Sequence, residues 1–293
     1  MGRIWTLSGL GWTTFLKRVW QQINEDDIWG RAAQLSYYFL LALFPLLLFL
    51  VTLFGYFASA SSQLRTGLLT YLGTVVPSSA VDLIRATLDE ISQGKGGGKL
   101  SFGLLAALWA ASNGMGAITQ TLNVAYDVEE TRSWLKVRLI SIGLTIFLAV
   151  LIISALVLVL YGGKIVDLIA AMADLTDTFR ILWKALQWPI VLGFLLIGFG
   201  TIYYFAPNLR ERTWRWITPG SVVAVVLWLL VSFAFRAYLH FFNSYSATYG
   251  SLGALIILML WFYLTGIAIL VGGEINSELD HAAQHQGELS LAR

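Results

Sequence analysis

The sequence contains no cysteine and few charged residues. Lys, Arg, Asp and Glu make up only 12% of the 293 residues, about half the share of roughly 25% that is usual in soluble domains. The absence of cysteine excludes a disulfide framework and a cysteine-ligated metal site. The scarcity of charge, with 57% hydrophobic residues and a mean hydropathy of +0.72, indicates a chain that has lipid as its solvent.

Long uncharged runs account for this composition. The run 252–273 has 22 residues without a charge and would form a helix about 33 Å long, enough to cross a hydrocarbon core of about 30 Å. Five further apolar runs cover 32–57, 101–122, 139–161, 188–205 and 219–240. The sequence therefore predicts an all-α polytopic membrane protein with six transmembrane helices in a membrane domain over 32–273.

Three other stretches have the spacing of amphipathic helices. Residues 4–23, within an N-terminal segment 1–31, combine four-residue apolar spacing with Trp, Lys and Arg. Two alternatives stay open for them: a helix at the membrane interface, or one docked on the protein's own surface. The stretches 62–92 and 164–187 show apolar stripes and are predicted to pack together as a helical cap outside the bilayer.

The distribution of basic residues predicts the orientation. Three basic residues lie in 123–138 and three in 206–217, whereas none lies in 243–251. Short loops rich in Lys and Arg stay in the cytoplasm. Six spans then place both termini, including the tail 274–293, in the cytoplasm and the proposed cap on the outer side.

Motifs for catalysis or cofactor binding are missing from the sequence. The net charge of +2 is too small to favour nucleic acid. Gly94 to Lys99 is a glycine-rich linker without the spacing of a phosphate loop, and His281 and His285 lack the carboxylate of a zinc-protease motif. We therefore expect no enzyme activity, no metal and no cofactor.

Polar residues within or beside the spans are the candidates for a substrate pathway, because they are costly in a membrane. The candidates are Ser36, Tyr37, Asn113, Asn123, Arg236, Tyr245, Tyr249, Glu274 and Asn276. Several also have a structural interpretation: Tyr37 in an aromatic belt, Asn113 at a close helix contact, Arg236 reaching to the interface, Glu274 at a helix end, and Tyr245 and Tyr249 in a turn or helix cap. For Glu274 the functional alternative is a site coupled to a proton or cation, together with Asn276.

Four strings carry a resemblance to a known family. They are AAQLSYYFLLALFPLLL at 32–48, LNVAYDVEETRSWLKVRL at 122–139, YYFAPN at 203–208, and SYSATYGSLGALIILMLWFYL continuing to GGEINSEL at 244–279. In this order they resemble the YihY/BrkB family of bacterial inner-membrane proteins. The resemblance implies six spans, cytoplasmic termini and a location in the bacterial inner membrane. It also implies that the family's older label of ribonuclease BN is a misassignment.

The leading functional hypothesis is a transporter or exporter of a small solute. The alternative is an envelope assembly factor or scaffold that docks partners on its outer cap. A ribonuclease is rejected, because the cytoplasmic loops are too short to form a basic RNA surface. The expected partners are the lipid bilayer and a small-molecule substrate, with no nucleic acid, and a homo-oligomer stays open.

Overall fold

The computed structural model describes residues 11–58, 66, 69–70, 85, 89, 97–173, 177–209, 217–241 and 245–291. All regular structure in these ranges is helical, which confirms the predicted fold class for this part of the chain. The helices are α1 (Trp12–Glu25), α2 (Ile28–Ala58), α5 (Gly97–Ala125), α6 (Trp134–Ala173), α7 (Asp177–Phe205), α8 (Pro219–Phe241) and α9 (Tyr245–Leu291).

Four of these helices contain segments long and apolar enough to cross a membrane. The segments are Trp134–Val159, Ala185–Phe205, Pro219–Tyr238 and Leu255–Ala283, and they match the last four predicted spans. The first two predicted spans fall on α2 and α5, which have 31 and 29 residues. Four candidate spans are therefore observed, and the total of six stays a prediction.

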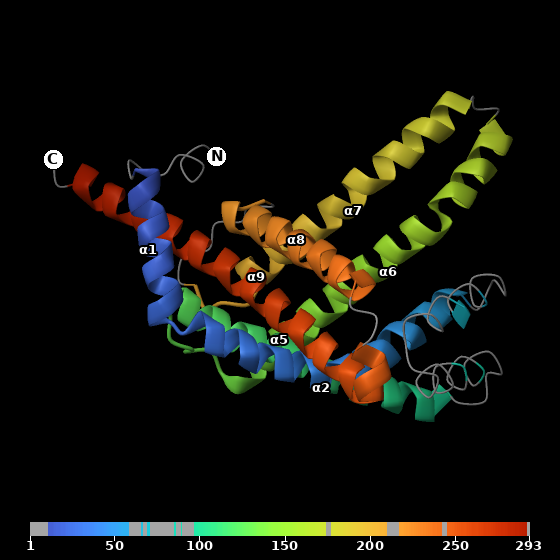
Figure 1. Cartoon of the computed structure of the whole chain (residues 1–293), viewed down its shortest axis with the longest axis horizontal. Helices are drawn as coiled ribbons and strands as arrows, with labels where there is room; N and C mark the ends of the chain where they lie inside the picture. The colour runs from blue at the N-terminus through green and yellow to red at the C-terminus, as the bar shows by residue number, and fades with distance from the viewer. Residues whose placement is uncertain are drawn as a thin grey trace.

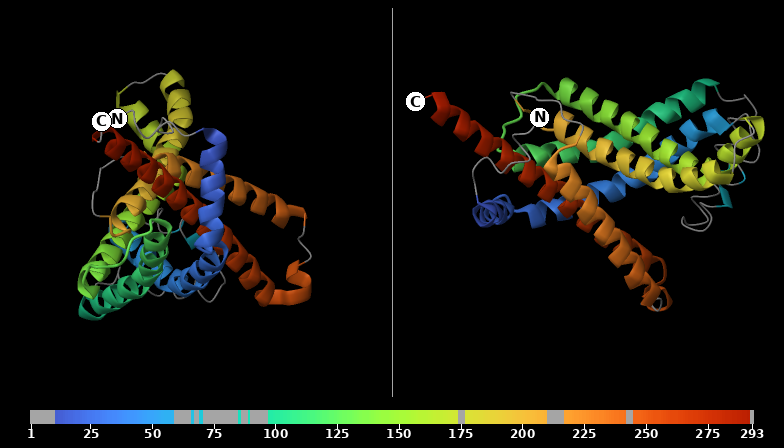
Figure 2. Two further views of the ribbon diagram at one scale, coloured as in Figure 1. Left: turned by 90° about the vertical axis from the view of Figure 1, so that its left-hand side faces the viewer. Right: turned by 90° about the horizontal axis from the view of Figure 1, so that it is seen from above.

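The helices converge at one end of the molecule. Figures 1 and 2 show α1 and the C-terminal part of α9 at this end, here called the terminal end, and the tip of the α6–α7 hairpin at the opposite end. Helix α2 packs against α5 and α9, α8 packs against α9, and α6 packs against α5 and α7. Helix α9 has 47 residues, about 70 Å at about 1.5 Å per residue, so it is longer than a bilayer is thick.

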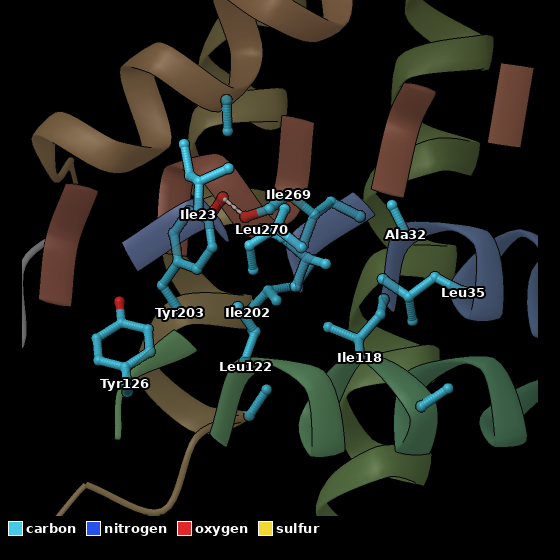
Figure 3. Packing of buried hydrophobic residues seen from close by; sticks show 14 of the residues in the cluster. Ile23, Ala32, Leu35, Ile118, Leu122, Tyr126, Ile202, Tyr203, Ile269 and Leu270 are labelled. Carbon is cyan, nitrogen blue, oxygen red and sulfur yellow. Dashed lines mark hydrogen bonds between the residues drawn. The ribbon is translucent and has the colours of Figure 1, made fainter. Parts of the chain in front are cut away.

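The largest hydrophobic core lies at the terminal end and joins all seven described helices. Its buried members include Phe15, Leu35, Ile118, Leu122, Tyr203 and Leu270, several of which are drawn in Figure 3. Elsewhere large apolar side chains face outward, for example Leu105, Leu230 and Phe233, which are 60–65% exposed. Apolar surface on this scale is stable only against lipid or another protein, in agreement with a membrane chain.

The apolar side chains of helix α1 lie partly in the protein core and partly on the surface. Phe15, Val19 and Ile23 are buried in the core, whereas Trp12 and Trp20 are 69% and 60% exposed. One side of the helix is therefore docked on the protein, as one alternative predicted. The exposed tryptophans form the type of surface that lies at a membrane interface. The predicted residues 4–10 lie outside the described part of the chain.

The two stretches predicted to form a cap have different outcomes. Residues 164–187 do not form a separate helix, because 164–173 continue α6 and 177–187 begin α7. Continuing each span adds backbone hydrogen bonds without a new helix nucleus, which a separate helix would need. Nearly all of 62–92 lies outside the described residues, so the cap itself stays a prediction.

The glycines within the second predicted span serve close packing. A Cβ atom built on Gly114 would lie 3.2 Å from the Cβ of Ala42 in α2, and one on Gly116 would lie 3.8 Å from Ser141 Oγ in α6. Ser112, two residues before Gly114, is fully buried. Small residues let helix backbones approach each other in membranes. This arrangement favours packing over a water-filled cavity at these positions.

Candidate functional site

Glu274 is the most unusual polar residue of the described chain. Its side chain is 0% exposed, and neither of its carboxyl oxygens receives a hydrogen bond from any described residue. It lies in α9, within the apolar segment Leu255–Ala283. Because an unpaired buried carboxylate is costly, this residue calls for a specific explanation.

Other acids surround Glu274. Asp26, in the turn between α1 and α2, lies within side-chain hydrogen-bonding reach of it, and the charges of Asp127 and Glu278 also act on it. Oxygen Oδ2 of Asp26 and oxygen Oε2 of Glu278 are likewise buried without a donor. Arg31 supplies the nearby positive charge, but its Nε donates to the backbone oxygen of Asp26 at 2.7 Å. We call Asp26, Asp127, Glu274 and Glu278 the acidic cluster.

Two tight turns bring the acidic cluster together. Asp27 and Asp127 have φ angles of 48° and 51°, a left-handed conformation that aspartate tolerates better than most residues. Oδ1 of Asp27 accepts a hydrogen bond from the backbone N–H of Gly30 at 3.2 Å and so caps the start of α2. Gln22 Nε2 in α1 donates to Oδ2 of Asp127 at 3.4 Å, which links α1 to the α5–α6 turn.

Asn276, two residues after Glu274, fixes α8 against α9. Its Oδ1 accepts from the backbone N–H of Gly220 at 2.9 Å, and its Nδ2 donates to Oγ1 of Thr218 at 3.0 Å. A Cβ atom on Gly272 would lie 2.7 Å from the backbone oxygen of Gly220. The start of α8 therefore rests directly on the backbone of α9 beside the acidic cluster.

Two buried tyrosines complete the surroundings of this crossing. Tyr203 Oη donates to the backbone oxygen of Ile269 at 2.7 Å, as the dashed line in Figure 3 shows. Tyr126, directly after α5, also packs against α9 near Gly273. Burial raises the pKa of its hydroxyl above the ordinary value of 10. It therefore stays neutral and adds no negative charge beside Glu274.

A second polar network holds the connections α5–α6 and α7–α8 together. Arg132 forms an ion pair with Glu130 at 2.6 Å and donates to the backbone oxygens of Phe205 and Ala206 at 3.3 and 2.8 Å. Asn123 donates to Glu130 at 2.9 Å, and its Oδ1 accepts from the backbone N–H of Asn208 at 2.8 Å. The hydrogen bond from Arg132 lowers the pKa of Glu130 from 4.5 to about 2, so the pair is fully charged near neutral pH.

Replacing Arg132 with alanine is expected to destabilise the protein by about 2 kcal/mol, because charged hydrogen bonds to two carbonyls and one carboxylate are lost. The melting temperature of the purified protein in detergent measures this loss. Lys136→Ala is the matched control, because the Lys136 side chain is exposed and its removal is expected to change the stability little. Equal melting temperatures for Arg132→Ala and the wild type would contradict this role.

Replacing Asp26 with asparagine is expected to stabilise the protein increasingly as the pH rises. Burial is the largest effect on the pKa of Asp26 and raises it above 3.8. The interaction with Glu274 lowers this pKa in part, and the charge of Asp127 raises it again. A group whose pKa is higher in the folded state holds its proton longer there, so stability decreases as the pH rises above about 3.8. Asparagine removes this decrease and keeps the backbone oxygen that binds Arg31.

The measurement for Asp26→Asn is its melting temperature relative to the wild type as a function of pH. The two curves are expected to meet in acid and to separate toward neutral pH, with the variant higher. A variant that is less stable than the wild type at neutral pH would show that the charge of Asp26 is compensated in the folded protein.

The structure separates the predicted pathway residues into groups. Glu274, Asn276 and Asn123 lie at the terminal end in the networks described above. Asn113 lies on an exposed part of α5, where its Oδ1 accepts from Arg138 Nη1 at 2.7 Å, and the Arg138 guanidinium stacks 3.8 Å above the Trp109 ring. Asn113 thus fastens α5 to α6 on the outside of the bundle.

The remaining predicted residues lie away from the acidic cluster or serve local contacts. Ser36 is buried but donates within its own helix to the backbone oxygen of Ala33 at 2.7 Å, and Tyr37 is 54% exposed. Arg236 is exposed and lies sixteen residues beyond Gly220 in α8, about 24 Å along the helix. Tyr245 and Tyr249 lie in the first turns of α9, and their side chains fall outside the described structure.

The sequence reasoning missed Asp26, Asp127, Glu278, Tyr126 and Thr218. A usable signal was present, because Asp26-Asp27 and Asp127 each follow a predicted helix whose end needs a residue that tolerates a left-handed turn. What the sequence does not contain is the contact between these turns and α9, which depends on how the helices cross.

Comparison with known proteins identifies similar chains over nearly the whole length. The chain matches the family described as Virulence factor BrkB over residues 19–292. It is 42% identical over 266 residues to the ribonuclease-like protein YfkH of Bacillus subtilis, covering 91% of this chain and 95% of that protein. It is 26% identical over 271 residues to a UPF0761 membrane protein of Aggregatibacter aphrophilus, covering 92% of each. No solved structure matches the chain.

Proposed function

Because the chain belongs to the family of the virulence factor BrkB, whose relatives include membrane proteins, we propose that it transports a small solute across the bacterial inner membrane. The observation that carries this proposal is Glu274, fully buried without a hydrogen-bond donor in a helix of membrane-spanning length. Ionisable residues inside membrane segments are typical of ion and substrate pathways.

The proposed topology has six spans, with α2 and α5 added to the four candidate segments. The terminal end then faces the cytoplasm, in line with the basic residues in 123–138 and 206–217. The acidic cluster lies at the cytoplasmic mouth of the bundle in this arrangement. The hairpins α6–α7 and α8–α9 diverge toward the other end (Figures 1 and 2), so relative tilting of hairpins about the terminal end is the motion we propose for transport.

A nuclease function is disfavoured by the charge of the same region. RNA carries one negative charge per phosphate, and proteins bind it with Lys and Arg. The part of α9 around Glu274 instead gathers Asp26, Asp127, Glu274 and Glu278. We therefore propose that the ribonuclease-like name of the YfkH relative does not describe a catalytic activity of this chain.

Electrical recording from proteoliposomes on a solid support tests the proposal. The purified protein is exposed in turn to organic anions, amino acids, polyamines and sugars, with protein-free vesicles as the control. We expect a transient current or solute uptake with at least one class, because charge moves when a coupled transporter turns over. If every class gives the response of protein-free vesicles, transport is wrong and the alternative of an envelope scaffold is favoured.

A further inference from the structure

We propose that Glu274 and Asp26 form a single proton-binding site, in which one proton is shared between the two carboxyl groups. The inference deepens the proposed function by naming the proton as the coupling ion. The existence of the site does not depend on transport; only the role of the proton in transport rests on the proposed function. The site is formed by three elements: α9 supplies Glu274, the α1–α2 turn supplies Asp26, and the α5–α6 turn places Asp127 beside them.

Geometry favours a proton between these two residues. Their side chains lie within hydrogen-bonding reach of each other, yet two ionised carboxylates are both acceptors and repel. A carboxyl–carboxylate pair resolves this conflict, because the protonated member donates to the ionised one. The same proton gives one of the Glu274 oxygens a hydrogen-bond partner, and the described residues supply no other donor to this side chain.

The charges that face the pair favour proton uptake. Asp127 and Glu278 act on Glu274, while Glu25, Asp127 and Arg31 act on Asp26. Among the described residues, these acidic groups outnumber Arg31, the cation that acts on the pair. The neighbouring polar side chains Tyr126, Thr218 and Asn276 add no charge, because the Tyr126 hydroxyl stays protonated and the other two do not ionise.

The proposed cycle is balanced in charge and atoms. With both carboxylates ionised the pair carries two negative charges, and binding one proton from water reduces this to one. Release of that proton restores the first state. Gly220 in α8 meets Gly272 in α9, two residues before Glu274. A change in this crossing would separate or join the two carboxyl groups and so drive release or binding of the proton.

Infrared difference spectroscopy of the protein in lipid nanodiscs tests the inference without any solute. A protonated carboxyl group has a C=O stretching band distinct from that of a carboxylate. We expect the wild type near neutral pH to show such a band, which disappears at alkaline pH. Glu274→Gln is expected to remove the band, and Asp26→Asn to shift it, because the acceptor changes from a carboxylate to an amide.

Glu129→Gln is the matched control, since Glu129 is exposed in the α5–α6 connection and is expected to leave the band unchanged. If the wild type lacks the band near neutral pH, or if neither Glu274→Gln nor Asp26→Asn alters it, the shared proton is wrong. Loss of the band on addition of sodium chloride at constant pH would instead assign the site to a metal cation. None of these outcomes depends on finding a transported solute, so this inference and the proposed function can fail separately.

Discussion

Replacing Gly272 with valine is expected to destabilise the protein by about 3 kcal/mol or more. A Cβ atom at this position would lie 2.7 Å from the backbone oxygen of Gly220 and 2.8 Å from the Cβ of Ala224, and it would also collide with the hydroxyl of Tyr203. Two of these three obstacles belong to helix α8 and cannot move independently. The two helices must therefore separate, with loss of the hydrogen bonds that Asn276 makes to α8.

Gly143→Val is the matched control, because a Cβ atom on Gly143 in α6 meets nothing within 4 Å. The melting temperature in detergent and the yield of folded protein in the membrane are the measurements. We expect both to fall for Gly272→Val and to change little for Gly143→Val. Equal values for the two variants would mean that α8 and α9 do not approach each other as closely as described.

Replacing Glu274 with glutamine is expected to reduce solute-driven current more than about tenfold, because glutamine keeps the size of the side chain but has no exchangeable acidic proton. The same change is expected to keep or raise the thermal stability. The amide donates a hydrogen bond to Asp26 at every pH, without a bound proton, and such a hydrogen bond contributes roughly 1 kcal/mol. Loss of activity without loss of stability is the signature of a functional residue.

The measurement compares current amplitudes at equal protein density for wild type, Glu274→Gln and the exposed-site control Glu129→Gln. The control is expected to match the wild type, since its side chain lies outside the acidic cluster. A Glu274→Gln protein with wild-type current would remove Glu274 from the mechanism. A Glu274→Gln protein that melts well below the wild type would identify Glu274 as a structural residue.

Much of the fold follows from hydrophobicity alone. Apolar runs of about twenty residues predict helices of bilayer length, and the spans predicted over 139–161, 188–205, 219–240 and 252–273 each fall within an observed helix. The ends were less predictable. Helices α6 and α9 continue far beyond their apolar segments, because nothing in the polar flanks breaks a helix that has already formed.

The candidate site was predicted only in part, and the reason is geometric. Glu274 and Asn276 are recognisable because polar residues at the end of an apolar run are costly. Asn113 and Arg236 carry the same signal, yet one binds Arg138 on the outside of α5 and the other is exposed near the far end of α8. The free-energy cost of a polar residue in a membrane identifies candidates in the sequence. Which of these residues contact each other depends on how the helices cross. The contact of Asp26 with Glu274 joins residues almost 250 positions apart, and no local pattern contains it.

Proton movement in sealed proteoliposomes tests the central claim most directly. Vesicles carry a pH-sensitive dye in the lumen, and a solute class that gives a current is added outside. If the acidic cluster couples transport to a proton, the wild type shows a change in lumenal pH that starts with solute addition and is absent for Glu274→Gln. Solute uptake by the wild type with no change in lumenal pH, at the same rate with and without an imposed pH gradient, would contradict the account.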